Sequence, residues 1–209
     1  MIILGTNSIK DTGYDVANSL RLDGTSARLL RSQSAGNRRT WTFSAWVKRS
    51  KIGHLGSLLG SSSAGNNNGY GQIRLQADDT LNYTAWDEWF ITNRLFRDPS
   101  AWYHIVFAVD TTQGTNTNRF KLYINGTQET SFSTINYPDQ NFDLSLNVNS
   151  ANVYLGAESY SAGTSRFFDG HMAEVCFIDG LQLGADSFGE FDEDSPTIWK
   201  PINVSGLTF

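Results

Sequence analysis

The sequence predicts an all-β protein folded as a sandwich of two antiparallel sheets. Apolar and polar residues alternate along several short segments, and no long segment repeats with the helical period. Turn-forming residues are frequent, with 19 Gly and many Asn, Ser and Thr. Aromatic residues make up 13% of the chain, which suits strands packed face to face. The length of 209 residues fits one large sandwich better than two small domains.

The first clear strands lie in the N-terminal half of the chain. A short strand is expected over residues 19–22, after a less regular beginning. The segment 41–48 alternates strictly, so Trp41, Phe43, Ala45 and Val47 share one face. The segment 102–110 is apolar on both of its faces, which predicts a central strand that is covered on both sides.

Turn signals define the later strands. Asn125-Gly126 separates the segments 120–124 and 127–132, and this pair supplies the two positive φ angles of a type I′ hairpin turn. Asn125 also begins a glycosylation acceptor, but the turn interpretation is favoured because no secretory signal precedes it. Asp169-Gly170 and Asp179-Gly180 predict turns at both ends of a strand over residues 171–178.

The charge balance and the cysteine content restrict the partners. The 16 Lys and Arg are outnumbered by 21 Asp and Glu, which argues against neutralisation of phosphates, so we expect no nucleic acid partner. No apolar stretch is long enough for a membrane helix, and the apolar start at residues 2–4 ends at Gly5, so we expect neither a membrane partner nor a signal peptide. Cys176 lies in an apolar run and is interpreted as a buried, inert thiol, in a protein made in a reducing compartment.

Several short motifs occur in a fixed order along the chain. The quoted segments are Phe43-Ser44-Ala45-Trp46-Val47, Trp102-Tyr103-His104 running on to Val109-Asp110, Leu122-Tyr123-Ile124-Asn125-Gly126, Leu155-Gly156, Phe168-Asp169-Gly170 and Glu174-Val175. Together they resemble the laminin G-like domains of the concanavalin A-like lectin/glucanase superfamily. This resemblance implies a two-sheet antiparallel jelly roll over residues 18–185. Residues 1–17 would then be an N-terminal arm, and residues 186–209 a C-terminal extension or the start of a further segment.

Three longer phrases, at residues 35–44, 96–105 and 188–190, resemble modules in virion proteins of tailed bacteriophages. The resemblance implies a structural or adhesive component of a virion, on a tail fibre or as a capsid-surface decoration. Such a protein would be assembled in the bacterial host cytoplasm and displayed on the virion surface. Its partners would be host-surface glycan or other virion proteins, and we expect a homo-oligomer, most simply a trimer. The alternative is a glycan-binding module of a larger bacterial or phage enzyme.

The chain lacks the carboxylate pair of the superfamily's glucanases, whose pattern is close to Glu-x-Asp-x-x-Glu. Retaining hydrolysis requires two carboxyl groups about 5 Å apart. The closest approach here is Glu190 and Asp192, in an acidic turn that lacks the final Glu. We therefore expect no catalytic residues and no enzymatic activity.

No metal or cofactor is expected, although calcium remains open because several domains of this fold hold it in rim loops through oxygen ligands. The candidate carboxylates do not form a spaced ligand motif; they are Asp78, Asp79, Asp110 and Asp169. The three histidines do not have metal-ligand spacing either, and we interpret them as hydrogen-bonded structural residues; they are His54, His104 and His171.

The best candidate for glycan recognition is Trp86-Asp87-Glu88-Trp89. Sugars stack their apolar faces on aromatic rings while carboxylates bind their hydroxyls, and this segment supplies both groups. The alternative is that both tryptophans pack in the core or against another subunit. Trp46 and Trp102 occupy strand positions of the family pattern, so we expect at least one of them to be largely buried.

Overall fold

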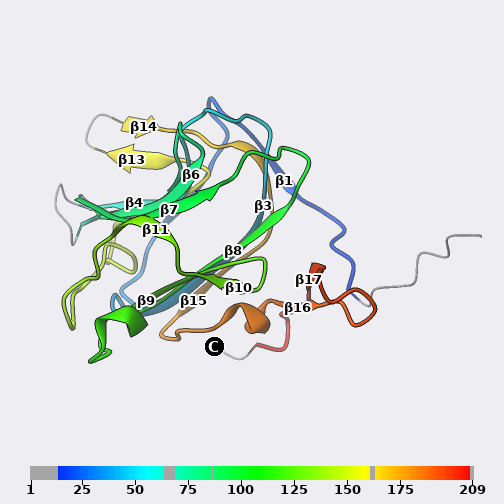
Figure 1. Cartoon of the computed structure of the whole chain (residues 1–209). Coiled ribbons are helices and arrows are strands. Elements are labelled where there is room, and N and C mark those ends of the chain that lie inside the picture. The colour runs from blue at the N-terminus through cyan, green and yellow to red at the C-terminus, as the bar shows by residue number, and fades with distance from the viewer. Residues whose placement is uncertain (1–13, 64–68, 86, 161–162, 208–209) are drawn as a thin grey trace, which may run out of the picture.

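Two antiparallel sheets packed face to face form the body of the protein, as the sequence predicts (Figure 1). The computed structural model describes residues 14–63, 69–85, 87–160 and 163–207. Within them, no helix has the length and hydropathy that a membrane crossing requires. The only helices described are two short 3-10 turns, η1 (Asn116–Asn118) and η2 (Ala185–Ser187).

One sheet, here called sheet A, has the strand order β1-β15-β3-β8-β9-β10. Its strands are β1 (Leu20–Asp23), β15 (Asp169–Asp179), β3 (Thr40–Arg49), β8 (Tyr103–Asp110), β9 (Phe120–Ile124) and β10 (Thr127–Glu129).

The second sheet, sheet B, has the order β11-β7-β6-β5-β4-β12-β2. Its strands are β11 (Phe132–Ile135), β7 (Asp87–Leu95), β6 (Thr80–Ala85), β5 (Tyr70–Leu75), β4 (Gly56–Ser62), β12 (Asn152–Leu155) and β2 (Leu29–Ser32). Two small hairpins complete the fold: β13 (Glu158–Tyr160) with β14 (Gly163–Ser165), and β16 (Gly189–Phe191) with β17 (Trp199–Pro201).

The core between the sheets follows the predicted alternation. The four residues at 41, 43, 45 and 47 of β3 are all 0% exposed and belong to one cluster with side chains of sheet B such as Ile73, Leu81 and Tyr83. Burial of a large apolar side chain contributes about 1.5–3 kcal/mol, so this strand stabilises the sandwich substantially.

The predicted central strand is β8, which lies between β3 and β9. Its inner face carries Ile105 and Phe107, which belong to the main core. On its outer face, Val106 belongs to a second apolar cluster with Ala185 and Phe188 of the C-terminal segment. The C-terminal segment therefore covers the outer face of sheet A, which explains why β8 is apolar on both sides.

The Asn125-Gly126 hairpin is confirmed, with φ angles of 49° and 79° between β9 and β10. The ring of Trp199 lies so close to Gly126 that a Cβ there would clash with it. The predicted Asp169-Gly170 turn is wrong, because both residues lie inside β15. Gly170 is required there for another reason: a Cβ would collide with the backbone carbonyl of Lys48 on the neighbouring strand.

Trp46 and Trp102, of which at least one was expected to be largely buried, both have intermediate exposure. The fully buried indole is that of Trp41. The physical reason is the period of two: Trp41 points into the core, so Trp46 on the same strand points to the outer face. Trp102 precedes the first residue of β8.

Candidate functional site

Four polar side chains form a compact group on the outer face of sheet B. In β5 and β6 the odd-numbered residues Ile73 and Leu81 point into the core, so the even-numbered residues point outward. The register places Gln72 opposite Thr84 and Arg74 opposite Asn82. We call this group the polar face; its residues are Gln72, Arg74, Asn82 and Thr84.

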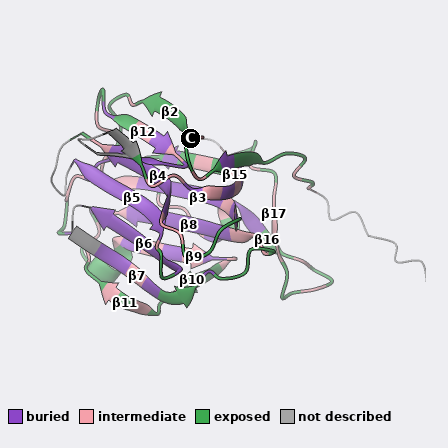
Figure 2. Ribbon diagram, turned by 90° about the horizontal axis from the view of Figure 1, so that it is seen from above, coloured by how far each residue is buried: buried purple, intermediate pink, exposed green. Residues whose placement is uncertain are grey.

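The polar face is buried, unlike an ordinary solvated sheet surface (Figure 2). Asn82 and Gln72 are each only 1% exposed. Both amide atoms of Asn82 and the side-chain oxygen of Gln72 are buried without a hydrogen-bond partner in the described part of the chain. An unmatched buried polar group costs about 1–3 kcal/mol, so native proteins usually satisfy it with water or a ligand. The polar face therefore holds unmatched hydrogen-bonding groups, which a ligand reaches only when the cover over them opens.

The hairpin β13–β14 builds one wall beside the polar face, above β4 (Figure 1). The carboxylate of Glu158, 3% exposed, accepts hydrogen bonds from Arg166 Nη1 at 2.8 Å, Ser165 Oγ at 3.1 Å and Tyr70 Oη at 3.2 Å. Burial raises the pKa of Tyr70, which keeps its hydroxyl neutral. Gly60 lets the hairpin approach, since a Cβ there would lie 2.9 Å from the carbonyl oxygen of Ala157.

The predicted glycan segment lies at the end of this face, but only part of it is described. Trp86 lies outside the described residues, as do the side chains of Asp87 and Glu88. The backbone register pairs Glu88 with Thr84, so β7 enters the sheet beside the polar face. For these three residues, contact with glycan stays a prediction.

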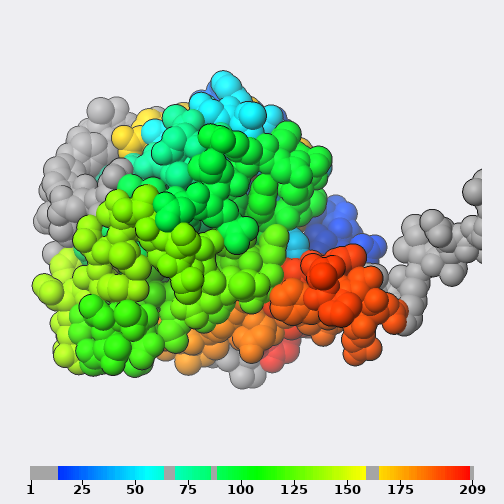
Figure 3. All heavy atoms as spheres, in the orientation of Figure 1, coloured from blue at the N-terminus to red at the C-terminus, as the bar shows by residue number. Residues whose placement is uncertain are grey.

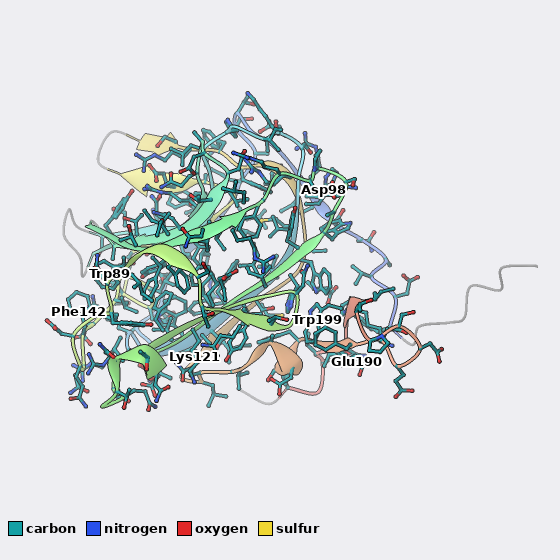
Figure 4. The ribbon with its side chains drawn as sticks, in the orientation of Figure 1. Trp89, Asp98, Lys121, Phe142, Glu190 and Trp199 are labelled. Atoms are coloured by element: carbon teal, nitrogen blue, oxygen red, sulfur yellow. The ribbon has the colours of Figure 1, made fainter. Side chains whose placement is uncertain are left out.

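Trp89 has a different environment. It is 7% exposed, and its ring centroid lies 6.0 Å from that of Tyr83 and 5.3 Å from that of Phe142 (Figure 4). This packing is the alternative raised from the sequence, and it leaves the indole face covered by aromatic side chains. The sequence does not reveal that Gln72 and Asn82 are buried. Alternating polar residues in a strand have the same pattern whether water or another part of the fold covers them.

The carboxylates considered for calcium are engaged by protein groups. Asp79 binds Arg49 Nη1 at 2.8 Å and Arg97 Nε at 3.0 Å. The other three accept hydrogen bonds as follows: Asp78 from Thr80, Asp110 from Thr112 and Gln113, and Asp169 from Arg21. Among the described residues, no group of three or more His, Cys, Asp or Glu is arranged to hold a metal ion.

The acidic turn at the C-terminal end forms an ion-paired cluster. Lys200 Nζ lies 3.4 Å from a carboxylate oxygen of Glu190 and 3.4 Å from one of Asp192. Glu190 and Lys200 face each other across the β16–β17 hairpin (Figure 4 labels Glu190). Hydrogen bonds from the backbone and from Lys200 hold the pKa of Asp192 below its usual value, which does not suit the general acid of a glycosidase.

The chain belongs to the concanavalin A-like lectin/glucanase superfamily, because a laminin G-type model of that superfamily matches residues 22–181. The predicted fold and family are thereby confirmed. No curated protein sequence matches the chain.

Solved structures of low sequence identity share the fold. Domain 4 of AbnA, an extracellular GH43 arabinanase from Geobacillus stearothermophilus, in complex with arabinotriose, has a TM-score of 0.55 at 21% identity over 79% of this chain and 72% of that one. The native heptameric SAP-like pentraxin from Limulus polyphemus gives 0.52 at 16% identity, over 75% and 73%. The CBM40 of the Ruminococcus gnavus IT-sialidase, bound to α2,3-sialyllactose, gives 0.51 at 15% identity, over 77% and 95%.

Proposed function

We propose that the chain is a non-catalytic module that binds glycan at the polar face of sheet B, by opening the cover over its buried amides. The observation that carries this proposal is the amide of Asn82, whose donor and acceptor are both buried without a partner among the described residues. Two neighbouring sugar hydroxyls provide the matching acceptor and donor. The side-chain oxygen of Gln72, likewise unmatched, accepts a further hydroxyl proton.

The composition of the polar face favours sugar over other ligands. Of its four residues only Arg74 is charged, whereas phosphate recognition commonly uses several cationic groups. An apolar ligand would leave the amides of Asn82 and Gln72 unmatched. The neighbours that carry bound arabinotriose and sialyllactose support the assignment of this fold to carbohydrate recognition.

The test replaces the unmatched amide by an apolar group of similar shape. Asn82→Leu should weaken glycan binding about tenfold or more, while the melting temperature does not fall, because the amide has no protein partner to lose. Isothermal titration calorimetry with arabinotriose, sialyllactose and host-surface polysaccharide measures the binding. Gln72→Met is a second variant of the same kind.

Asn93→Leu is the matched control. This exposed amide of β7 donates to Ser131 Oγ at 3.0 Å, away from the polar face, so its loss should leave the affinity unchanged. The proposal is wrong if the wild-type chain binds none of these glycans, or if Asn82→Leu and Gln72→Met bind as well as the wild type.

We further propose that the module is part of a bacteriophage virion, on a tail fibre or on the capsid surface. The support is the resemblance of residues 35–44, 96–105 and 188–190 to phage virion modules. Assembly would take place in the host cytoplasm, and the partners would be other virion proteins and host-surface glycan. The alternative, a module of a larger enzyme, is compatible with the same fold.

Immunogold labelling separates these two assignments. Antibody against this chain should label tail fibres or capsids of purified particles in electron micrographs, and sedimentation should give a trimer. Absence of label, together with a catalytic domain in the same reading frame, would favour the enzyme module.

A further inference from the structure

The two flanks of the chain meet at a pocket of about 300 Å³ on the outer face of sheet A. Its walls are Val16–Ser19 from the N-terminal side, Pro201 of β17 from the C-terminal side, and Trp46, Trp102 and Ala173 from the sheet. Figure 3 shows the orange and red C-terminal residues as a lobe beside the blue residues that begin the described chain. The pocket therefore exists only because both flanks fold back onto the sandwich.

The C-terminal wall is held in place by a stack of rings. Trp46 stacks on His104 with ring centroids 4.9 Å apart, and His104 stacks on Trp199 at 5.9 Å. Trp199 Nε1 also donates a hydrogen bond to His104 Nδ1 at 2.9 Å. Since Trp199 and Pro201 share β17, these contacts fix the position of Pro201 relative to Trp46.

The remaining walls are held by separate contacts. Tyr14 Oη donates to Glu174 Oε2 at 2.9 Å, which anchors the N-terminal segment next to Ala173. The ring of Trp102 meets that of His171 edge-on, with centroids 6.4 Å apart. The two indoles are thus oriented before any ligand arrives, and preorganisation of this kind reduces the entropy lost on binding.

The lining restricts the chemistry of the ligand. Trp46 and Trp102 are partly buried, so each still presents part of its ring. None of the lining residues carries a charge, and their polar side chains are those of Asn18 and Ser19. Aromatic rings beside a few neutral hydrogen-bonding groups match a sugar ring, which has an apolar face and a hydroxylated edge. The volume lies at the lower limit of ligand sites, so it suits one ring rather than a peptide strand.

We propose that this pocket is a second ligand site, which binds one neutral pyranose ring against Trp46 and Trp102. It is independent of the polar face, because the two lie on the outer faces of different sheets. A module with two sites can hold two sugar chains, or two parts of one chain, and so gain avidity for a dense glycan layer.

The indole N–H signals of Trp46 and Trp102 in nuclear magnetic resonance spectra report on the pocket directly. The probes are methyl glucoside, methyl galactoside and N-acetylglucosamine, with sialic acid as the charged comparison and N-acetyl-leucinamide as the apolar one. At least one neutral sugar should shift both signals in a saturable way. Trp102→Ala should weaken that sugar roughly tenfold, as expected for a lost stacking contact of about 1.4 kcal/mol.

Asn82→Leu separates the two sites. It should leave the shifts of Trp46 and Trp102 unchanged even where it abolishes binding at the polar face, so the failure of one proposal is distinguishable from the failure of the other. The pocket proposal is overturned if no neutral sugar shifts the two signals, or if sialic acid or N-acetyl-leucinamide shifts them at lower concentration. Because the signals are read in the wild-type chain, this result does not depend on the folding of Trp102→Ala.

Discussion

His104 is enclosed between the indole rings of Trp46 and Trp199, and its side chain has no exposed surface. Because an indole nitrogen only donates, Nδ1 of His104 must be the acceptor for Trp199, and Nε2 then carries the proton. That proton is donated to Ser44 Oγ at 2.9 Å. The predicted structural role of this histidine is confirmed, in its neutral form and in one tautomer.

This environment makes the stability depend on pH. Burial lowers the pKa of His104 from 6.5 to about 4, so the unfolded chain binds more protons than the folded one between these values. The stabilisation that the neutral imidazole of His104 contributes is fully present above pH 6.5, and it is lost as the pH falls towards 4. Its size is on the order of 3 kcal/mol. Urea unfolding at a series of pH values should show this fall, and the slope should be smaller in His104→Gln.

Carboxyl groups also titrate in part of this pH range. The comparison of urea unfolding between the wild type and His104→Gln therefore needs a control variant. His54→Gln, which replaces a half-buried histidine whose Nε2 contacts the carbonyl oxygen of Phe167, is the matched control. Equal slopes in the wild type and in His104→Gln would show that His104 does not cause the dependence.

Residue by residue, the sequence predicts the face of a side chain better than its burial. Alternation correctly placed Trp41 and Phe43 towards the core. It could not show that Asn82 is covered, because burial on the outer face of sheet B depends on parts of the chain far away in sequence, as the contact of β13 with β4 illustrates. The same limitation applies to Trp46, which a family pattern placed on a strand without specifying its side.

The C-terminal segment covers apolar side chains on the outer face of sheet A. Ala185 and Phe188 cover Val106 and Ile178, which would otherwise be exposed apolar side chains of the outer face. Trp199 then joins this cover to the Asn125-Gly126 turn and to His104. The segment is therefore a packed part of the fold rather than a detached extension.

Loss of Trp199 should loosen this element without unfolding the sandwich. Its ring stacks on His104 and meets Phe191 edge-on at 4.9 Å, so Trp199→Ala removes both contacts and the hydrogen bond. We expect about 2 kcal/mol less protection, or roughly 30-fold faster hydrogen exchange, at amides of β16 and β17. Amides of β3 should exchange as in the wild type.

Trp199→Phe is the matched variant, because it keeps an aromatic ring and removes only the donor. It should lose about 1 kcal/mol of protection, the usual contribution of one hydrogen bond. If β3 loses protection together with β16 and β17, the segment unfolds only with the whole domain.

At the level of elements, strands with two-residue turns were the easiest to predict. The type I′ turn at Asn125-Gly126 is local chemistry, since the positive φ angles favour these two residues. The β16–β17 hairpin was not predicted, because its acidic sequence resembles a solvated turn. Its strands are held by Lys200 and by Trp199 against sheet A, and such tertiary contacts leave no local period in the sequence.

Over the whole molecule, the two candidate sites lie on the outer faces of the two sheets, and the core between them is apolar. Neither site contains a pair of free carboxylates among the described side chains. Glu158, beside the polar face, is held by Arg166 and by the hydroxyls of Tyr70 and Ser165. These contacts give the carboxylate of Glu158 a structural role.

The acidic turn at Glu190 and Asp192 does not meet the requirements of a glycosidase. Hydrolysis of a glycosidic bond requires a protonated acid and a second carboxylate, about 5 Å apart in retaining enzymes and about 6.5–9.5 Å apart in inverting ones. Lys200 lies 3.4 Å from both Glu190 and Asp192, so both carboxylates are ion-paired. Hydrogen bonds from the backbone and from Lys200 lower the pKa of Asp192, which is therefore not suited to hold a proton at neutral pH. Purified protein should therefore release no reducing ends from host polysaccharide that it binds. Activity that disappears in Glu190→Gln or Asp192→Asn, with unchanged melting temperature, would show that the module is an enzyme.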